Sequence, residues 1–310
     1  MKEPMSARST EDTEPIVVQF AGSAVLIDCR DEPVRGPLLE HLGHCRDSAH
    51  VSTPLPRATF RVEAEVDRVY RLLREESLIC AGLRAADAAV RLVYEVTLEL
   101  AASCRSHLVF HAAGLARDGR GLILCGESGR GKSTLATRLV AAGFDFLSDE
   151  LVTVDPGAGE MRGFPRAIGL KDVSPFAGQS ELDELTDPAE SSPAGCVAYV
   201  NPNRLRPDCV RQLARPAVLA FPRYAAATLE SPRRLSPAEA AYQLMARLTN
   251  GLSLTDRGFA ATARLARTLP AYSFPYSDSG RAGDWFTRTM ADPGNDLSHA
   301  SLLHQQPKLL

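Results

Sequence analysis

The sequence contains no long hydrophobic run. No stretch of about 18 uninterrupted apolar residues occurs in the 310-residue chain, and residues 1–15 lack the apolar segment that a signal peptide requires. These absences argue against a membrane-spanning helix and against export. We therefore expect a cytoplasmic protein that makes no membrane contact.

The chain also lacks an excess of positive charge and any clustering of cysteine. Lys and Arg number 35 against 38 Asp and Glu, which gives a formal net charge of -3. Proteins that bind a nucleic-acid backbone normally carry a surplus of positive charge on one face, so we expect no nucleic-acid partner. The seven cysteines are widely spaced and form no CxxC pair, which predicts neither a disulfide framework nor a zinc site.

What the chain does have is the composition of a globular protein, with 45% hydrophobic and 24% charged residues. Residues 1–14 are polar and are expected to form a disordered leader. Two β-rich segments follow: PIVVQFAGSAVLID, with a predicted hairpin turn at Ala21 and Gly22, and ATFRVEAEV. They predict a small, strand-rich α+β N-terminal module over residues 15–84. A core domain is predicted over residues 85–290, followed by a C-terminal tail over residues 291–310.

A glycine-rich loop carries the strongest functional signal. The segment GESGRGKST fits the Walker A pattern GxxxxGK[ST], follows the apolar strand LILC and opens a predicted helix. Glycines allow consecutive backbone N–H groups to face phosphates, and a helix N-terminus adds a favourable dipole. Lys132 is expected to bridge the β- and γ-phosphates, Ser133 to bind Mg²⁺, and Thr134 to have a mainly structural role. The predicted nucleotide-binding loop consists of Gly126, Glu127, Ser128, Gly129, Arg130, Gly131, Lys132, Ser133 and Thr134.

Two adjacent carboxylates form the second signal. Asp149 and Glu150 end a predicted strand 17 residues after Lys132, so one helix returns the chain to a neighbouring strand. The end of that strand is expected to lie beside the phosphate loop. One carboxylate could then hold a metal ion while the other accepts a hydroxyl proton. The alternative is a pair of solvated acids at a strand end.

These residues carry a family resemblance. Residues 111–152 resemble the catalytic core of the HPr kinase/phosphorylase family, and more closely the shorter HPr-kinase-related proteins. The matching features are His111 before the loop, the loop itself, and the paired acids after the helix. The resemblance implies that Lys132 binds phosphate, that Ser133 and Glu150 bind Mg²⁺, and that Asp149 is the general base. It places His111 near the transferred phosphate.

The resemblance also implies a second set of contacts. The segment EMRGF, beginning at Glu160, is similar to a motif that follows the paired acids in this family, which makes Glu160 a further candidate metal ligand. The related proteins carry FPR followed by LK in this region. Arg166 and Lys171 match these motifs and are candidate contacts for phosphate or substrate. Arg223, in AFPRY, is a weaker candidate of the same kind.

Together these patterns predict an α/β fold, with a P-loop HPr-kinase-like core and mixed sheet preceded by the small N-terminal module. The predicted function is ATP- and Mg²⁺-dependent transfer of the γ-phosphoryl group to a serine of a peptide or small protein. The acceptor would be an HPr-like protein or, as in the lasso-peptide-cluster branch, a precursor peptide. A regulatory ATPase without an acceptor and a kinase for a small metabolite stay open. The resemblance also raises a homo-oligomer, and the sequence does not distinguish ATP from GTP.

Overall fold

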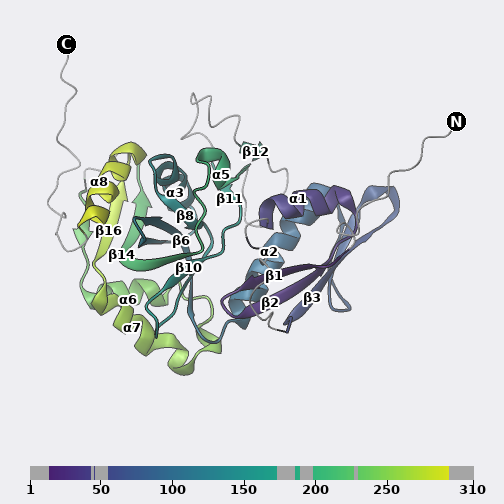
Figure 1. Ribbon diagram of the computed structural model, residues 1–310, viewed down its shortest axis with the longest axis horizontal. Coiled ribbons are helices and arrows are strands. Elements are labelled where there is room, and N and C mark those ends of the chain that lie inside the picture. The colour runs from purple at the N-terminus through teal and green to yellow at the C-terminus, as the bar shows by residue number, and fades with distance from the viewer. Residues whose placement is uncertain are drawn as a thin grey trace, which may run out of the picture.

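The computed structural model describes residues 14–42, 45, 55–172, 198–226 and 230–292, together with the backbone of residues 186–188. Nearly all of the predicted leader and tail lie outside the described residues. Figure 1 shows two parts: a strand-rich part built from the first third of the chain, and a larger α/β part that contains the rest.

The first part is a five-stranded sheet in the order β1-β2-β3-β4-β5. Strands β2 and β3 are parallel, and the other neighbours are antiparallel. The predicted hairpin is confirmed, because Phe20 pairs with Ser23 across Ala21 and Gly22, which both have positive φ. The strands are β1 (Ile16–Phe20), β2 (Ser23–Asp28), β3 (Ala58–Ala64), β4 (Tyr70–Arg74) and β5 (Ser77–Leu83).

Two helices, α1 (Glu32–Leu42) and α2 (Ala85–Ser103), cover this sheet. Good helix formers fill α2, and its buried residues Ala88, Leu92 and Val96 recur every fourth position along one face. They share one hydrophobic core with the first sheet. Packing thus groups α2 with the N-terminal strands, whereas the sequence analysis grouped it with the residues that follow.

The second part contains an eight-stranded sheet in the order β10-β9-β6-β7-β14-β16-β15, in which β8 also pairs with β6. Strands β7, β14 and β16 are parallel to one another, and the remaining pairs are antiparallel, which confirms an α/β fold with a mixed sheet. The strands are β6 (Leu108–Arg117), β7 (Arg120–Cys125), β8 (Asp145–Ser148), β9 (Leu151–Val154), β10 (Met161–Gly163), β14 (Leu213–Tyr224), β15 (Arg233–Arg234) and β16 (Ala271–Tyr276).

Helices cover both faces of this sheet. Alternate residues of β7 and β14 enter separate cores, one shared with α3 (Lys132–Ala141) and α8 (Ser279–Ala291), the other with α6 (Pro237–Met245) and α7 (Phe259–Thr268). Figure 1 shows these pairs on opposite sides of the strands. Ser236 and Glu239 form a capping box at the start of α6.

The remaining elements are short. A three-stranded sheet has the order β11-β13-β12. These strands and the short helices are β11 (Ile168–Leu170), β12 (Thr186–Pro188), β13 (Ala198–Val200), α5 (Pro202–Leu205), η2 (Val66–Arg68), η4 (Gly251–Ser253) and η5 (Thr255–Gly258). No helix in the described part of the chain has both the length and the apolar character needed to cross a lipid bilayer.

Candidate functional site

The loop 126–131 joins the end of β7 to the first residue of α3. Gly131, its last residue, has a φ of 85°, a left-handed conformation that glycine tolerates best. The Tyr276 hydroxyl donates to the Gly131 carbonyl oxygen at 2.7 Å, and a Cβ atom at Gly131 would collide with that hydroxyl. Both the left-handed φ and the lack of room for a Cβ atom therefore require glycine immediately before α3.

Lys132 begins α3 and is buried, with 6% of its surface exposed. Its Nζ donates to the carbonyl oxygens of Gly126 at 2.8 Å and Glu127 at 3.1 Å, and lies 3.3 Å from His111 Nε2. Burial lowers the pKa of Lys132, against the opposing effect of the Asp149 and Glu150 charges. The ammonium group is thus fixed inside the loop, next to two carboxylates.

Glu150 lies at the centre of a polar network. Its Oε1 is 3.1 Å from His111 Nδ1 on β6, and its Oε2 accepts a 2.8 Å bond from the guanidinium of buried Arg166. Burial raises the pKa of Glu150, but the His111 hydrogen bond and the Arg166 charge outweigh it and bring the pKa to about 2. A neutral His111 that donates from Nδ1 to Glu150 and accepts from Lys132 at Nε2 satisfies both of its contacts.

Asp149 has the opposite electrostatic setting, although it is adjacent in sequence. Its side chain is buried, with 3% of the residue exposed, and its Oδ2 accepts the Gly169 N–H at 3.0 Å. It lies close to Ser133, at the start of α3. Burial and the nearby Glu150 charge raise its pKa to about 6, against the smaller opposing effect of Arg166. Its Oδ1 is buried and has no partner among the described residues.

These groups line one cavity of ≈ 680 Å³, within the usual size range of ligand pockets. Lys171, beyond the end of β11, closes part of its wall by donating to the Ser128 hydroxyl at 2.6 Å. The predicted residues that line this cavity are His111, Ser128, Gly129, Gly131, Lys132, Ser133, Thr134, Asp149, Glu150, Arg166 and Lys171. The structure therefore gathers residues that are spread over 61 positions of the sequence, from 111 to 171.

The cavity also has walls that the sequence analysis missed. Tyr94 reaches it from α2, in the N-terminal part of the molecule, and Tyr224 and Tyr276 reach it from the ends of β14 and β16. Asp278, which caps α8, lines it as well. These residues carry no motif and lie far from the loop in sequence. The parallel alignment of β7, β14 and β16 brings Tyr224 and Tyr276, at the ends of β14 and β16, beside the loop that follows β7.

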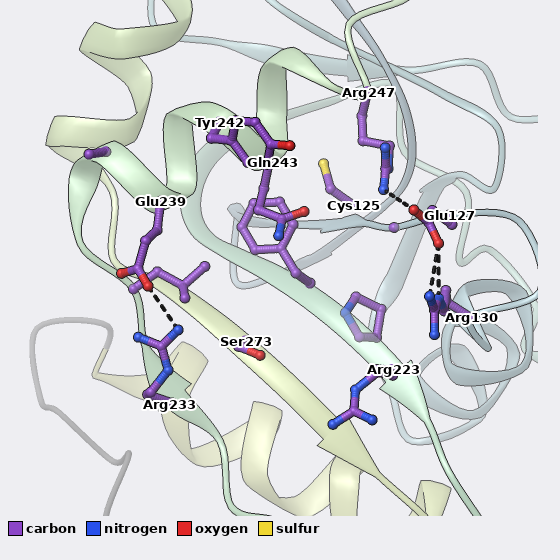
Figure 2. A pocket seen from close by; sticks show the side chains of 15 residues that line it. Cys125, Glu127, Arg130, Arg223, Arg233, Glu239, Tyr242, Gln243, Arg247 and Ser273 are labelled. Carbon is purple, nitrogen blue, oxygen red and sulfur yellow. Dashed lines mark hydrogen bonds and ion pairs between the residues drawn. The ribbon is translucent and has the colours of Figure 1, made fainter.

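Other predicted residues line a second cavity, of ≈ 560 Å³, on a different side of the loop. Gly126, Glu127 and Arg130 contribute to it, as does Arg223 from β14. Figure 2 shows the Glu127 carboxylate between two guanidinium groups: Arg130 at 2.9 Å and Arg247, which follows α6, at 3.3 Å. The Arg247 carbonyl oxygen also accepts the His111 N–H at 2.9 Å. Arg247 thus connects the loop to the strand that carries His111.

Glu160 is not brought to either cavity, which corrects its prediction as a metal ligand. It precedes β10, and Met161 pairs with Val154 at the far end of β9 from Glu150. Three steps along β9 correspond to roughly 10 Å. The Glu160 side chain is half-buried and lies 3.4 Å from Arg162. The short hairpin between β9 and β10 therefore turns it away from the paired acids.

No group of three or more His, Cys, Asp or Glu side chains within the described ranges is arranged to hold a metal ion by itself. Among the groups described above, Asp149, Glu150 and the Ser133 hydroxyl offer oxygen donors for a hard cation. The unpartnered Oδ1 of Asp149 is available to such a cation. Each Glu150 oxygen has a second lone pair beyond the one used by His111 or Arg166. These oxygen donors fit Mg²⁺ when the substrate supplies further ligands.

Comparisons with known proteins show a distant structural likeness. No family model matches the chain, and no curated protein matches it in sequence. Among solved structures, it is similar to the HPr(Ser) kinase/phosphatase from Coxiella burnetii, with a TM-score of 0.32 and 14% sequence identity. The match covers 60% of this chain and 88% of that one.

Proposed function

We propose that this chain is an ATP-dependent phosphotransferase that moves the γ-phosphoryl group of ATP to a serine hydroxyl of a peptide or small protein. The observation that carries the proposal is the shared cavity. It places the buried Lys132 ammonium, the start of α3 and the paired acids Asp149 and Glu150 around one space. A cation, a helix N-terminus and a carboxylate with raised pKa are the parts that phosphoryl transfer requires.

The loop and α3 supply the nucleotide site. The first N–H groups of α3 have no partners within the helix, and with the loop N–H groups they favour binding of the phosphates. Lys132 neutralises phosphate charge in a site from which most water is excluded. Tyr224, whose side chain is exposed beside the end of the loop, offers aromatic surface for the base. We propose that the loop 126–131 acts in this way as a P-loop.

Asp149 is the proposed general base. With a pKa raised to about 6, it is mostly ionised at neutral pH and is a better proton acceptor than an ordinary aspartate. Its unpartnered Oδ1 would take the serine proton while the serine oxygen bonds to the γ-phosphorus. The bond from that phosphorus to the β,γ-bridging oxygen breaks, and ADP leaves with the electron pair.

Mg²⁺ would be held by Ser133 and Glu150, with Asp149 alongside, and would neutralise charge on the phosphates. The protein's own residues prepare this arrangement. His111 and Arg166 each hold one oxygen of Glu150, so the carboxylate is kept ionised and fixed in orientation. We propose His111 as a contact of the transferred group, since it lies between Lys132 and Glu150. Arg166 and Lys171 are proposed substrate contacts on the same wall.

The acceptor is proposed to be an HPr-like protein or a lasso precursor peptide, rather than nucleic acid or a membrane component. Tyr94 lets the N-terminal part of the molecule contribute to the acceptor side of the cavity. We also propose a cytoplasmic location and a homo-oligomeric assembly. A serine on an extended segment would enter the cavity more easily than one on a rigid element.

The products of ATP turnover test this proposal. The purified protein would be incubated with γ-labelled ATP and Mg²⁺ in the presence of serine-bearing peptides, an HPr-like protein or hydroxylated metabolites. Label on a peptide or protein serine, lost in Lys132→Ala and in Asp149→Asn, supports the proposal. Asp155→Asn is the matched control, because Asp155 is an acid on an exposed turn outside the cavity. Label only in free phosphate would favour a regulatory ATPase, and label on a metabolite would favour a small-molecule kinase.

A further inference from the structure

A third cavity lies at the end of the large sheet opposite the loop, and four arginines line it. They are Arg120 at the start of β7, Arg215 in β14, Arg234 in β15 and Arg267 in the last turn of α7. The cavity has a volume of ≈ 520 Å³, and no Asp or Glu is among its lining residues. We call this group the arginine cluster.

The arginine cluster is not explained by the protein's overall charge or by its internal contacts. The chain carries a net charge of -3, so a patch of one positive sign is a local feature. Arg120 donates to the carbonyl oxygens of Met290 and Ala291. Within the described residues, the guanidinium groups of Arg215, Arg234 and Arg267 have no ion-pair partner.

Grouping these charges has an energetic cost. Arg120 and Arg215 are direct neighbours across β7 and β14, and like charges that face each other repel. All four residues are exposed, so their charges are partly screened but not removed. An external anion would relieve this repulsion, and guanidinium groups suit carboxylates through paired hydrogen bonds.

The spread of the arginine cluster indicates the shape of that anion. Arg120 and Arg234 lie on β7 and β15, which are separated by two intervening strands in the order β7-β14-β16-β15. Three strand spacings correspond to about 14 Å across the sheet, and the register places Arg234 level with Leu124, four steps or about 13 Å along β7 from Arg120. The two backbone positions are thus roughly 19 Å apart, which is wider than a single phosphate group and equals about five or six residues of extended peptide. Among described strands, β15 pairs only with β16, so its outer edge is open for main-chain hydrogen bonds.

We propose that the arginine cluster binds an acidic, extended segment of the peptide or small-protein acceptor, remote from its serine. This docking site would add a substrate contact to the proposed function, and it rests on that function only for the identity of the partner. Strand β7 runs from Arg120 to Cys125, immediately before the loop, and its five steps span about 17 Å. The acidic segment therefore lies at least about five residues from the serine that enters the cavity.

Fluorescence anisotropy with a labelled peptide of five consecutive glutamates in a Gly/Ser context tests the proposal without ATP. We expect Arg215→Ala/Arg234→Ala to weaken binding about tenfold, since two charged contacts are lost. Arg57→Ala/Arg105→Ala removes the same charge from exposed arginines outside the cavity and should bind like the wild type. Lys132→Ala should also bind normally.

Each other outcome overturns the docking proposal. Equal weakening in both double variants would show non-specific attraction, and no binding by the wild type would show that the site takes no acidic peptide. Competition by pyrophosphate as effective as that by the five-glutamate peptide would show a small-anion pocket instead. Because this assay uses no nucleotide, specific peptide binding by a protein that phosphorylates no acceptor would refute the proposed function and leave the docking site standing.

Discussion

Replacing Asp149 with asparagine is expected to stabilise the free protein while abolishing phosphoryl transfer. The Asp149 carboxylate is buried, and its folded-state pKa of about 6 lies above the usual aspartate value of 3.8. The folded state therefore binds this proton more tightly than the unfolded state does. The resulting loss of stability is absent below pH 3.8, grows as the pH rises, and is complete above about pH 6.

The size of the Asp149 pKa shift sets the size of the expected change in the free energy of unfolding. Because one pKa unit corresponds to about 1.4 kcal/mol, raising this pKa from 3.8 to about 6 lowers the stability by about 3 kcal/mol at pH 8 and by about half as much at pH 5. Asparagine is close to aspartate in size, and its amide oxygen can still accept the Gly169 N–H. The variant should therefore gain up to about 3 kcal/mol in free energy of unfolding at pH 8, and about half of that at pH 5.

Urea denaturation of the wild type and the variant at several pH values between 5 and 8 measures this difference. Glu150, with a pKa of about 2, stays ionised throughout that window and contributes equally to both proteins. Asp155→Asn serves as the control of opposite sign. Backbone hydrogen bonds lower the pKa of Asp155, so its neutralisation should reduce stability. A variant at Asp149 that is less stable than the wild type at pH 8, or whose gain does not depend on pH, would refute this reasoning.

Three further predictions concern the surroundings of the loop. Gly131→Ala should prevent ATP binding, measured by calorimetry, because the added Cβ atom collides with the Tyr276 hydroxyl. The double variant Gly131→Ala/Tyr276→Phe, which lacks that hydroxyl, should recover part of the binding. Arg247→Ala should weaken ATP binding about two- to fivefold, because Glu127 loses one of the two guanidinium groups that hold it, and should leave the free energy of unfolding unchanged within about 1 kcal/mol. Arg166→Ala should lower the free energy of unfolding by about 2 kcal/mol, measured in urea, because it leaves the half-buried Glu150 carboxylate without its cation.

The sequence predicted local features well where one short segment decides the structure. The turn at Ala21 and Gly22 depends on a few adjacent residues and occurs as expected. The capping box at Ser236 depends in the same way on residues within one helical turn. The approach of Asp149 to the start of α3 was also predictable, since one helix and one strand separate it from Lys132. Local chemistry and a short return connection suffice in these cases.

Features that depend on distant pairing were not predictable in the same way. Glu160 resembled a family position, but strand register places it at the wrong end of the β9–β10 hairpin. Tyr276 belongs to the cavity because β16 aligns with β14. Tyr94 belongs to it because α2, through Val90, packs against Ala167 and Tyr199. Arg247 meets Glu127 through a fold in which they are 120 positions apart. A single sequence does not encode such contacts in a local pattern.

The most direct test of phosphoryl transfer is the intact mass of a serine-bearing acceptor after incubation with ATP, Mg²⁺ and the purified protein. The account predicts that the acceptor gains the mass of one phosphoryl group, that replacing its serine with alanine prevents the gain, and that Asp149→Asn retains ATP binding but does not modify the acceptor. An acceptor modified equally well by Asp149→Asn would contradict the assignment of the base. Modification that persists in Lys132→Ala would contradict the assignment of the cavity itself.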